Sequence, residues 1–222
     1  MRNILTILVL ILSPVLVAFG EKSAINANDL SKKNGIFYYD KFSQEAYTGE
    51  VVSWYENGEP EFKGYLIRGM KNGLWEYFHE NGLLSKKGKY KYSKRVGLWT
   101  YFHENGSVSQ KGNFKNDLVT GVWETFDSNK TFSIKTTYKE SEFDFLQELF
   151  NSNGSLRQRG NFKNGQMDGL REYFDMDGSL EMTIHYKHGK RDGLMEIYNV
   201  DREVRSRYCF QDDKKVDMSL CM

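Results

Sequence analysis

Polar and apolar residues alternate along most of the chain, in short runs that end at a polar turn signal. Residues 73–82 read Gly-Leu-Trp-Glu-Tyr-Phe-His-Glu-Asn-Gly, and residues 97–106 read Gly-Leu-Trp-Thr-Tyr-Phe-His-Glu-Asn-Gly. Such alternation predicts half-buried β-strands, and the i, i+3, i+4 spacing of an amphipathic helix is nearly absent. Asn-Gly after a strand is a strong signal for a hairpin with a two-residue type I′ turn. We therefore predict strands of about six and about eight residues, joined by Asn-Gly, with a polar connector to the next hairpin.

The same pattern recurs every 24 residues without insertion or deletion. We call the opening glycine position 0. It falls at Gly49, Gly73, Gly97, Gly121, Phe145 (a substitute), Gly169 and Gly193. An aromatic residue stands at position 5: Trp54, Phe78, Phe102, Phe126, Phe150, Phe174 and Tyr198. Position 8 is Asn or Asp, and position 17 is nearly always aromatic. A fixed period over seven units is the signature of a repeat array.

The residues themselves indicate how the two strands of a hairpin pair. A two-residue Asn-Gly turn places position 2 opposite position 15, and position 3 opposite position 14. Trp75 then faces Gly88, so that a large indole ring covers bare backbone. Glu76 faces Lys87, and opposite charges meet in four of the five units with Glu at position 3. A register shifted by one residue would mix tryptophan with lysine on one face. We predict one aromatic face and one face with ladders of Glu and Lys/Arg, which also holds the position-5 aromatics.

These patterns predict an all-β protein, an elongated single-sheet array of tandem 24-residue β-hairpin repeats. The expected divisions are a signal peptide at 1–20, an N-terminal segment with a degenerate cap at 21–48, seven repeats at 49–216 and a tail at 217–222. Phe42 falls in the aromatic register of the cap. The units that begin at Gly121 and Phe145 are the least regular, with Lys130, Thr136 and Phe145 at signature glycine sites. A bend, a binding surface or ordinary decay of the repeat would each explain this irregularity.

The N-terminus has the composition of a secretory signal peptide. Met1–Asn3 precede an apolar run over residues 4–19, and cleavage after Gly20 or Ala18 would fit. An uncleaved anchor helix is the alternative. No Cys follows the run, so a lipid anchor is not expected. We therefore expect a periplasmic or secreted protein with no integral membrane domain after cleavage.

Charge and cysteine content narrow the possible partners. Removing residues 1–20 deletes only Arg2 among the charged residues, which leaves 30 basic and 30 acidic residues. A neutral chain argues against nucleic acid as the main partner. Cys209 and Cys221 are the two cysteines, and an oxidising compartment would allow a terminal disulfide. Two free thiols are the alternative.

Candidate chemistry is sparse, and we expect no enzyme, no cofactor and no metal site. His79 and His103 share position 6, but two strands separate them by roughly 9–10 Å, too far for one zinc ion. The glutamate ladder could mimic a glycosidase pair, except that its members face Lys or Arg. The strongest binding signal is the regular aromatic spacing, which could grip a protein or stack on sugars, or simply pack the sheet. The candidate ligand contacts are Trp75, Trp99, Trp123, Phe78, Phe102 and Phe126.

Two connectors carry a family resemblance. Residues 186–194 read Tyr-Lys-His-Gly-Lys-Arg-Asp-Gly-Leu, and residues 160–165 read Gly-Asn-Phe-Lys-Asn-Gly. They resemble the bacterial MORN-repeat variant, and the resemblance covers residues 46–212. Such proteins are often described as YwqK-like antitoxin components, which implies binding to a partner protein. We therefore expect a non-enzymatic scaffold for protein–protein interaction in the cell envelope or outside the cell. The resemblance implies an antitoxin-like component as the narrower function, and carbohydrate or cell-wall binding is the alternative.

Overall fold

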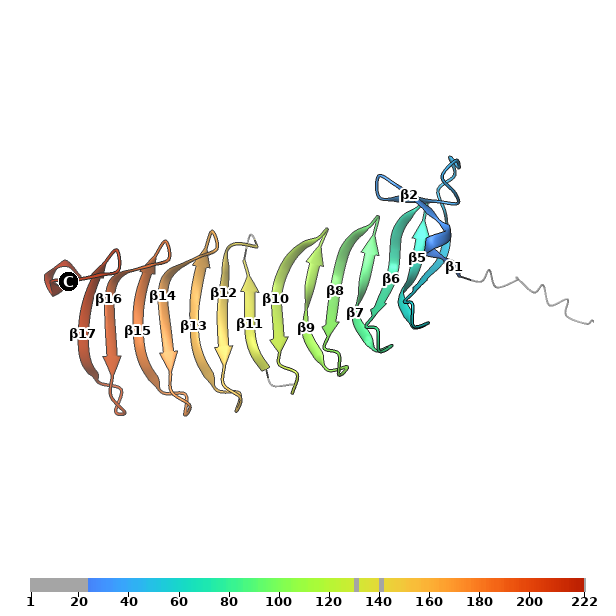
Figure 1. Ribbon diagram of the computed structural model, residues 1–222. Coiled ribbons are helices and arrows are strands. Elements are labelled where there is room, and N and C mark those ends of the chain that lie inside the picture. Colours follow the sequence, from blue (N-terminus) through green and yellow to red (C-terminus); the bar gives the residue numbers. More distant parts are fainter. Residues whose placement is uncertain (1–23, 130–131, 140–141, 222) are drawn as a thin grey trace, which may run out of the picture.

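The computed structural model describes residues 24–129, 132–139 and 142–221. The predicted signal peptide and Lys130 lie outside these ranges. The main sheet has 16 strands that pair in chain order after β1, and it forms one elongated array (Figure 1). Its strands are β1 (Ile25–Asn26), β4 (Gly49–Trp54), β5 (Pro60–Ile67), β6 (Met70–Phe78), β7 (Leu84–Lys91), β8 (Lys94–Phe102), β9 (Val108–Lys115), β10 (Leu118–Phe126), β11 (Phe132–Tyr138), β12 (Phe145–Phe150), β13 (Leu156–Lys163), β14 (Gln166–Phe174), β15 (Leu180–Lys187), β16 (Lys190–Tyr198), β17 (Val204–Gln211) and β18 (Lys214–Val216).

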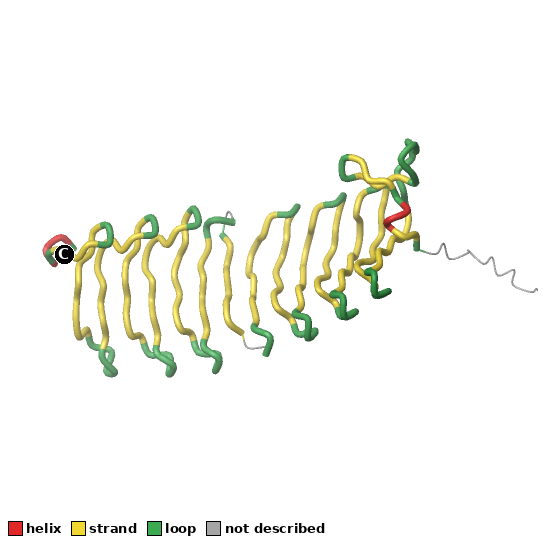
Figure 2. Tube along the Cα trace, in the orientation of Figure 1, coloured by secondary structure: helices red, strands yellow, loops and turns green. Residues whose placement is uncertain are grey.

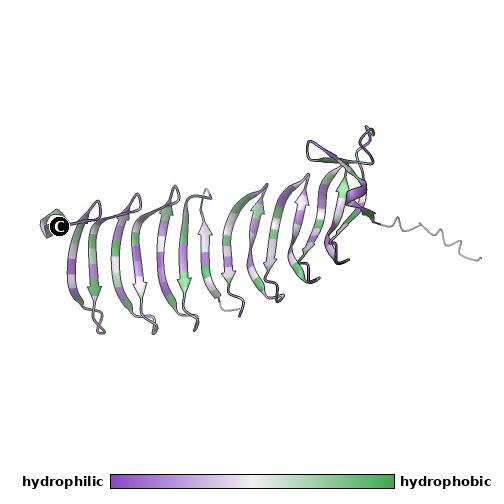
Figure 3. Ribbon diagram, viewed as in Figure 1, coloured by the Kyte–Doolittle hydropathy of each residue, from purple (hydrophilic) through white to green (hydrophobic). Residues whose placement is uncertain are grey.

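The predicted fold class is confirmed, and so is the predicted register. Trp75 pairs with Gly88, and Glu76 pairs with Lys87. The equivalent pairs recur in the next unit, where Trp99 faces Gly112. Turns lie at both ends of the strands (Figure 2). We call the side of the sheet with the Asn-Gly turns the Asn-Gly edge, and the side with the connector turns the connector edge. Bands of hydrophobic and hydrophilic residues recur from hairpin to hairpin (Figure 3).

The predicted type of the Asn-Gly turn is wrong. The His79 amide donates to the Leu83 carbonyl at 2.8 Å, and the Gly82 amide donates to the His79 carbonyl at 2.9 Å. The loop therefore has three residues, with Gly82 alone in the left-handed region at φ 79°. This geometry is a β-turn followed by a glycine bulge. A second bulge between Tyr77 and Phe78 compensates for the extra loop residue, which is why the register further along the strands still holds.

Two-residue turns occur instead at the connectors. In the connector between β13 and β14, Asn164 and Gly165 both have positive φ, 49° and 74°. Both central residues of a type I′ turn require this conformation. The strands therefore run through most of the polar connector, and the position-0 glycine lies inside a strand. Gly73, for example, sits in β6 with φ 71°, where the pairing with β5 is shifted by a bulge.

The tryptophans pack in a direction that the hairpin pairing alone did not indicate. Trp75 faces Gly88 in its own hairpin, yet its ring lies over Gly64 of the preceding one. A Cβ added to Gly64 would come within 2.3 Å of the Trp75 ring. The Trp75 Nε1–H donates to the Tyr65 carbonyl at 3.2 Å on that same strand. Each tryptophan therefore joins two hairpins. The same contacts hold for Trp99 over Gly88 and Trp123 over Gly112.

Both ends of the array are covered. β1 pairs in parallel with β4, the first long strand, and the segment after β1 buries Leu30 and Tyr47 against Val51. A small separate hairpin, β2 (Ser31–Lys33) with β3 (Ile36–Tyr38), completes this cap. Phe42, predicted in the aromatic register, is 82% exposed and lies outside the packed cluster. Short or covered edge strands prevent edge-to-edge association of sheets.

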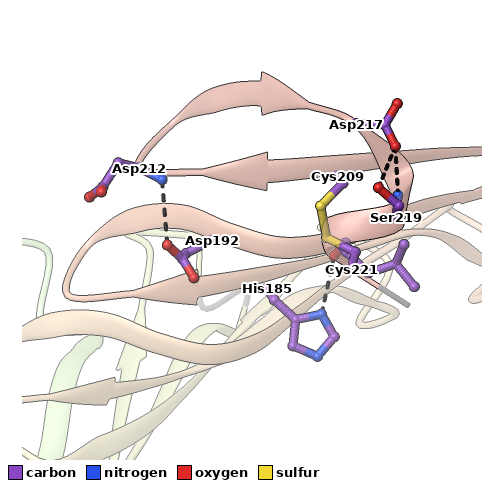
Figure 4. Close-up of a disulfide and its surroundings, with 8 residues drawn as sticks. His185, Asp192, Cys209, Asp212, Asp217, Ser219 and Cys221 are labelled. Atoms are coloured by element: carbon purple, nitrogen blue, oxygen red, sulfur yellow. Dashed lines mark hydrogen bonds between the residues drawn. A yellow bond between two sulfur atoms is a disulfide. The ribbon is translucent and has the colours of Figure 1, made fainter.

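At the other end, β18 pairs with β17 and a disulfide fastens the tail. Cys209 of β17 is bonded to Cys221, which follows the 3-10 turn η2 (Met218–Leu220) (Figure 4). Asp217 caps η2 by accepting a hydrogen bond from the Ser219 amide at 2.9 Å. The Cys209 side chain is buried under this tail. The disulfide form of the two predicted alternatives is thus the one in the structure.

The irregular units stay within the continuous sheet. β11 pairs with β12 from Ile134 to Tyr138 without a register shift. Phe145, which replaces the opening glycine, stacks on Phe162 with ring centroids 4.6 Å apart. The Gly–Trp contact of the earlier units is absent here, because Thr136 and Gln147 occupy the two positions. The Phe145–Phe162 stack lies within one hairpin. Between the two hairpins, the Tyr138 and Phe145 rings are in contact, with centroids 5.6 Å apart.

Candidate interaction surface

The two faces of the sheet differ in how much of their apolar surface is buried by packing within the array. The aromatic face carries positions 2, 4 and 17, and the charged face carries positions 1, 3, 5, 14, 16 and 18. On the aromatic face, the exposed fractions of Trp75, Trp99 and Trp123 are 0%, 1% and 5%. Their rings meet tyrosine and phenylalanine rings edge to face, as Tyr90 meets Trp99 at 5.0 Å. These three predicted ligand contacts pack the sheet, and their indole rings offer no free surface to a ligand.

A half-buried lysine, Lys71, adds to the packing of this face. The Lys71 ammonium lies 4.2 Å from the Trp75 ring centroid and donates a hydrogen bond to the Tyr77 hydroxyl at 2.7 Å. The same ammonium also lies over the rings of Phe62 and Tyr90. Burial lowers the pKa of Lys71 to about 8, with smaller contributions from Lys32 and Lys86. The negative faces of the rings favour the ammonium, but removal from water outweighs them.

The predicted contacts at position 5 lie on the charged face under basic side chains. Phe78, Phe102 and Phe126 are half-buried. Lys63 stands over the Phe78 ring at 5.5 Å, and Lys111 stands over the Phe126 ring at 5.5 Å. Both cations come from position 14 of the preceding hairpin. These phenylalanines therefore contribute contacts between hairpins, and only their uncovered edges remain for a partner.

The ion pairs of the charged face mostly join neighbouring hairpins, and the predicted pairing within a hairpin is wrong for most of them. Glu76 binds Lys63 of the preceding hairpin at 3.0 Å, not the predicted Lys87. The same direction holds for Lys111–Glu124, Lys135–Glu148 and Arg159–Glu172. Arg207 and Glu196 do pair within one hairpin, at 2.8 Å. Glu76, Glu124 and Glu148 each have a cation on both neighbouring strands and pair with the cation of the preceding hairpin.

Sequence reasoning missed an aliphatic stripe on the charged face. It consists of the position-1 residues Leu74, Leu98, Val122 and Leu170, which are 51%, 57%, 41% and 38% exposed. Leu98 pairs with Asn113, and Leu74 with Lys89, so the stripe crosses the strands along the array. The signal was present in the sequence, because position 1 is Leu or Val in six of seven units. Position 1 is next to the tryptophan at position 2 but lies on the opposite face of the strand.

A row of lysines runs beside the aliphatic stripe. This lysine ladder consists of the position-18 residues Lys91, Lys115, Lys139, Lys163 and Lys187, all exposed. Lys115 follows Asn113, the partner of Leu98, by two residues, so the two rows lie roughly 7 Å apart. Lys139 donates to the Asn161 side chain at 3.0 Å. Within the described ranges, no ladder lysine forms an ion pair with a carboxylate.

The Asn-Gly edge is held by hydrogen bonds between successive turns. The Asn81 side chain donates to the Glu104 carbonyl at 2.8 Å and accepts from the Leu83 amide at 3.0 Å. His79 Nε2 lies 3.1 Å from the Phe102 carbonyl, and His103 Nε2 lies 3.1 Å from the Phe126 carbonyl. Both histidines therefore bridge adjacent turns. In the described part of the chain, no group of three His, Cys, Asp or Glu side chains is placed to hold a metal ion.

One exposed aromatic site lies at the N-terminal end of the charged face. Trp54 is 49% exposed, because no basic residue of a preceding hairpin covers it. It lines a hollow of about 460 Å³ with Tyr65 and Leu74, and Glu50 and Glu76 stand at its wall. A second hollow of about 540 Å³ lies at the connector edge between Lys115 and Phe143. The first combines apolar surface with carboxylates and could hold a small polar ligand.

Comparison with known proteins identifies the repeat. Residues 47–66, 95–116 and 146–164 match the family described as "MORN repeat variant". The matches name the repeat and not the narrower antitoxin-component family. No protein with a curated description matches the chain. Among the helices of the described residues, none is long and apolar enough to cross a membrane.

Two similar solved structures are a crystal structure of TarM and one of a mutant of S. aureus TarM in complex with fondaparinux, alpha-GlcNAc-glycerol and UDP. Each is 17% identical with a TM-score of 0.34, and the match covers 46% of this chain and 20% of that chain. The present chain thus aligns with about a fifth of the length of those proteins.

Proposed function

We propose that this array of MORN-variant hairpins is a non-enzymatic scaffold that binds a protein partner along its charged face. The observation that carries the proposal is the aliphatic stripe. Leu74, Leu98 and Val122 remain substantially exposed at equal intervals, while the aromatic face buries its largest side chains. Regular apolar residues left in water, bordered by charged ones, are typical of a surface that a partner covers.

The chemistry of the surface supports a binding role rather than a catalytic one. The position-3 glutamates are engaged by cations, and hydrogen bonds from Arg207 and Tyr198 hold the pKa of Glu196 below its usual range. Ionised, paired carboxylates are poor proton donors. The predicted signal segment and the terminal disulfide together support a site in the cell envelope or outside the cell, since disulfides persist in oxidising compartments.

The narrower possibility is an antitoxin-like role, in which the bound partner is a toxin of the same compartment. The resemblance to antitoxin components supports it. Co-expression tests it: the chain should restore growth of cells that produce a toxin encoded next to it, and a variant with Leu74→Lys and Leu98→Lys should not. Equal rescue by both forms would separate the antitoxin role from the charged face.

The binding proposal is tested by capture from an envelope extract of the producing cell. The bait is the mature chain, and the compared baits are Leu74→Ser/Leu98→Ser on the stripe and Val200→Ser at an exposed turn. We expect a protein retained by wild type and by Val200→Ser, and depleted at least fivefold on the stripe variant. Retention that is equal on all three baits would contradict the proposal.

A carbohydrate is the second candidate ligand, and the hollow at Trp54 now supports it in place of the tryptophan stripe. A half-exposed indole beside Tyr65, with Glu50 and Glu76 as hydroxyl acceptors, suits stacking on a sugar ring. The other three tryptophans are buried. A soluble glycan that binds here should therefore change only the Trp54 contribution to fluorescence, and Trp54→Phe should abolish the change. A glycan response that survives in Trp54→Phe would exclude this site.

A further inference from the structure

We infer that the charged face binds an extended acidic segment of the partner in the polyproline II conformation, with one apolar residue in every three. This inference rests on the proposed protein-binding function and names the chemistry of the partner. Apolar side chains of the segment would cover the aliphatic stripe, and its carboxylates would pair with the lysine ladder.

The acidic character of the partner follows from the contacts of the carboxylates near the lysine ladder, none of which, among the residues that the structure describes, is bound to a ladder lysine. At the connector edge, Asp117 binds Arg95 at 2.8 Å and Asp213 binds Arg191 at 3.0 Å. The Asp144 side chain accepts from the Asn164 amide at 2.8 Å. These three acids are therefore engaged by arginines or by a backbone amide, whereas Asp212 binds Lys190, which is not a ladder lysine. The ladder lysines keep their charge for an external anion.

The strand pairing also sets like charges opposite each other at this edge. Lys91 pairs with Lys94 across one connector turn, and Lys187 pairs with Lys190 across another. Like charges directly opposite in a hairpin disfavour folding. Only Lys190 among these four has an ion pair, with Asp212 at 3.1 Å. An arrangement that opposes folding and recurs in two hairpins is explained if an anionic partner neutralises it.

The spacing of the two rows selects the conformation of the partner. Successive members lie two strands apart, which is roughly 9.4–9.8 Å. A polyproline II segment returns to the same side every three residues, or about 9.3 Å. Over the two steps from Leu74 to Val122 the mismatch stays below about 1 Å, which side-chain rotamers absorb.

Other regular conformations fit this spacing less well. A β-strand presents a residue to one side every two residues, or about 6.8 Å. Many of its side chains would therefore fall between successive members of a row and not on them. An α-helix repeats its face after seven residues at about 10.5 Å, so its mismatch grows by about 1 Å at each step. The geometry therefore favours a segment with period three, such as repeats of Val-Glu-Pro.

The inference is tested with three synthetic 15-residue peptides and the full mature chain, by fluorescence anisotropy at physiological ionic strength. The first peptide repeats Val-Glu-Pro, the second scrambles the same composition, and the third replaces Glu by Gln. We expect the first to bind at least tenfold more tightly than either of the others. Equal affinity for the first and second peptides would overturn the spacing argument, and equal affinity for the first and third would overturn the charge argument.

Variants of the chain place the site. Lys91→Gln/Lys115→Gln should weaken binding of the Val-Glu-Pro peptide at least tenfold, and Leu74→Ser/Leu98→Ser should do the same. Lys86→Gln is the matched control, because Lys86 lies on the same strand as Lys91 but over the Tyr77 ring on the aromatic face. It should change the affinity less than twofold. A loss as large in this control as in the ladder variant would overturn the assignment to the charged face.

A competition experiment tests whether another polyanion occupies the charged face in place of a peptide. Polygalacturonate and phosphatidylglycerol vesicles, each at equal charge concentration, should displace the Val-Glu-Pro peptide only weakly. Tighter binding of either would overturn the peptide proposal. If none of the peptides binds while the envelope capture still depends on Leu74 and Leu98, the partner chemistry inferred here is wrong and the protein-binding function stands. Capture that does not depend on the stripe contradicts the function itself.

Discussion

Replacing Gly88 by alanine should destabilise the array strongly, because the added methyl group has no room. A Cβ at Gly88 would lie 2.3 Å from Trp99 Cδ2, whereas carbon atoms in contact prefer about 3.5–4.0 Å. Trp99 is buried and its Nε1–H donates to the Lys89 carbonyl at 3.2 Å, so the ring cannot move without loss. Overpacking costs about 1–3 kcal/mol, and a weakened hydrogen bond adds about 0.5–1.5 kcal/mol. We expect a loss of about 2–4 kcal/mol.

Gly160 provides the matched control, because it occupies the same repeat position with a different neighbour. Its Cβ would lie 3.3 Å from Cγ of Arg171, a mild crowding that a shift of a few tenths of an ångström relieves. Alanine also restricts the unfolded chain, which favours folding by about 0.4–1 kcal/mol. Gly160→Ala should therefore change stability by less than about 0.5 kcal/mol. In the Trp99→Leu background, Gly88→Ala should likewise cost little.

The assay is native-state hydrogen exchange, because a repeat array opens locally and a single unfolding curve would average its parts. Amides of β7 and β8 report on Gly88→Ala, and amides of β13 and β14 report on Gly160→Ala. Equal losses for the two substitutions would refute the packing argument. So would a Gly88→Ala cost that persists unchanged after Trp99→Leu.

Three further predictions concern the turns, the tail and Lys71. Asn81→Asp keeps the acceptor for the Leu83 amide but loses the donor to the Glu104 carbonyl. We expect the local stability to fall by about 0.5–1.5 kcal/mol, seen as faster hydrogen exchange at residues 103–106. Unchanged exchange there would contradict the turn contacts. Reduction of Cys209–Cys221 releases a loop closed over 12 residues and should destabilise the last hairpin by up to about 3 kcal/mol without changing exchange at residues 73–126. Lys71 has a pKa of about 8, below the 10.5 of an unfolded lysine, so the folded chain binds fewer protons between these values and stability should rise as pH increases from 7 to 9, by about 1 kcal/mol. Urea unfolding should show this rise in wild type and not in Lys71→Met, and a flat profile in wild type would contradict the burial of the ammonium.

The sequence predicted the strand register well, because the register depends on complementary residues within one unit. Trp opposite Gly, and Glu opposite Lys, each exclude a shift by one residue. The turn types could not be assigned in the same way. A glycine with positive φ serves both a two-residue turn and a three-residue loop, and Asn81 is explained by its bond to the next turn, which one unit does not reveal.

The contacts between hairpins were the harder part to predict. A tryptophan lies between two glycines, Gly64 and Gly88 for Trp75, and the pattern gives no reason for the ring to choose one side. The same ambiguity affects Glu76, which has a lysine on each neighbouring strand. The candidate surface depends on these choices, because they decide which rings are buried. The aliphatic stripe is the candidate surface because its side chains stay exposed while the tryptophans are covered.

Lysine labelling of the complex tests the binding role of the charged face most directly. The mature chain, alone and bound to the partner captured from the envelope, is acetylated briefly and the modification of each lysine is measured. We predict that the reactivity of Lys91 and Lys115 falls at least fivefold in the complex, while Lys86, on the aromatic face of the same strand as Lys91, reacts equally in both states. Protection of Lys86 with Lys91 and Lys115 fully reactive would place the partner on the opposite face and contradict the account.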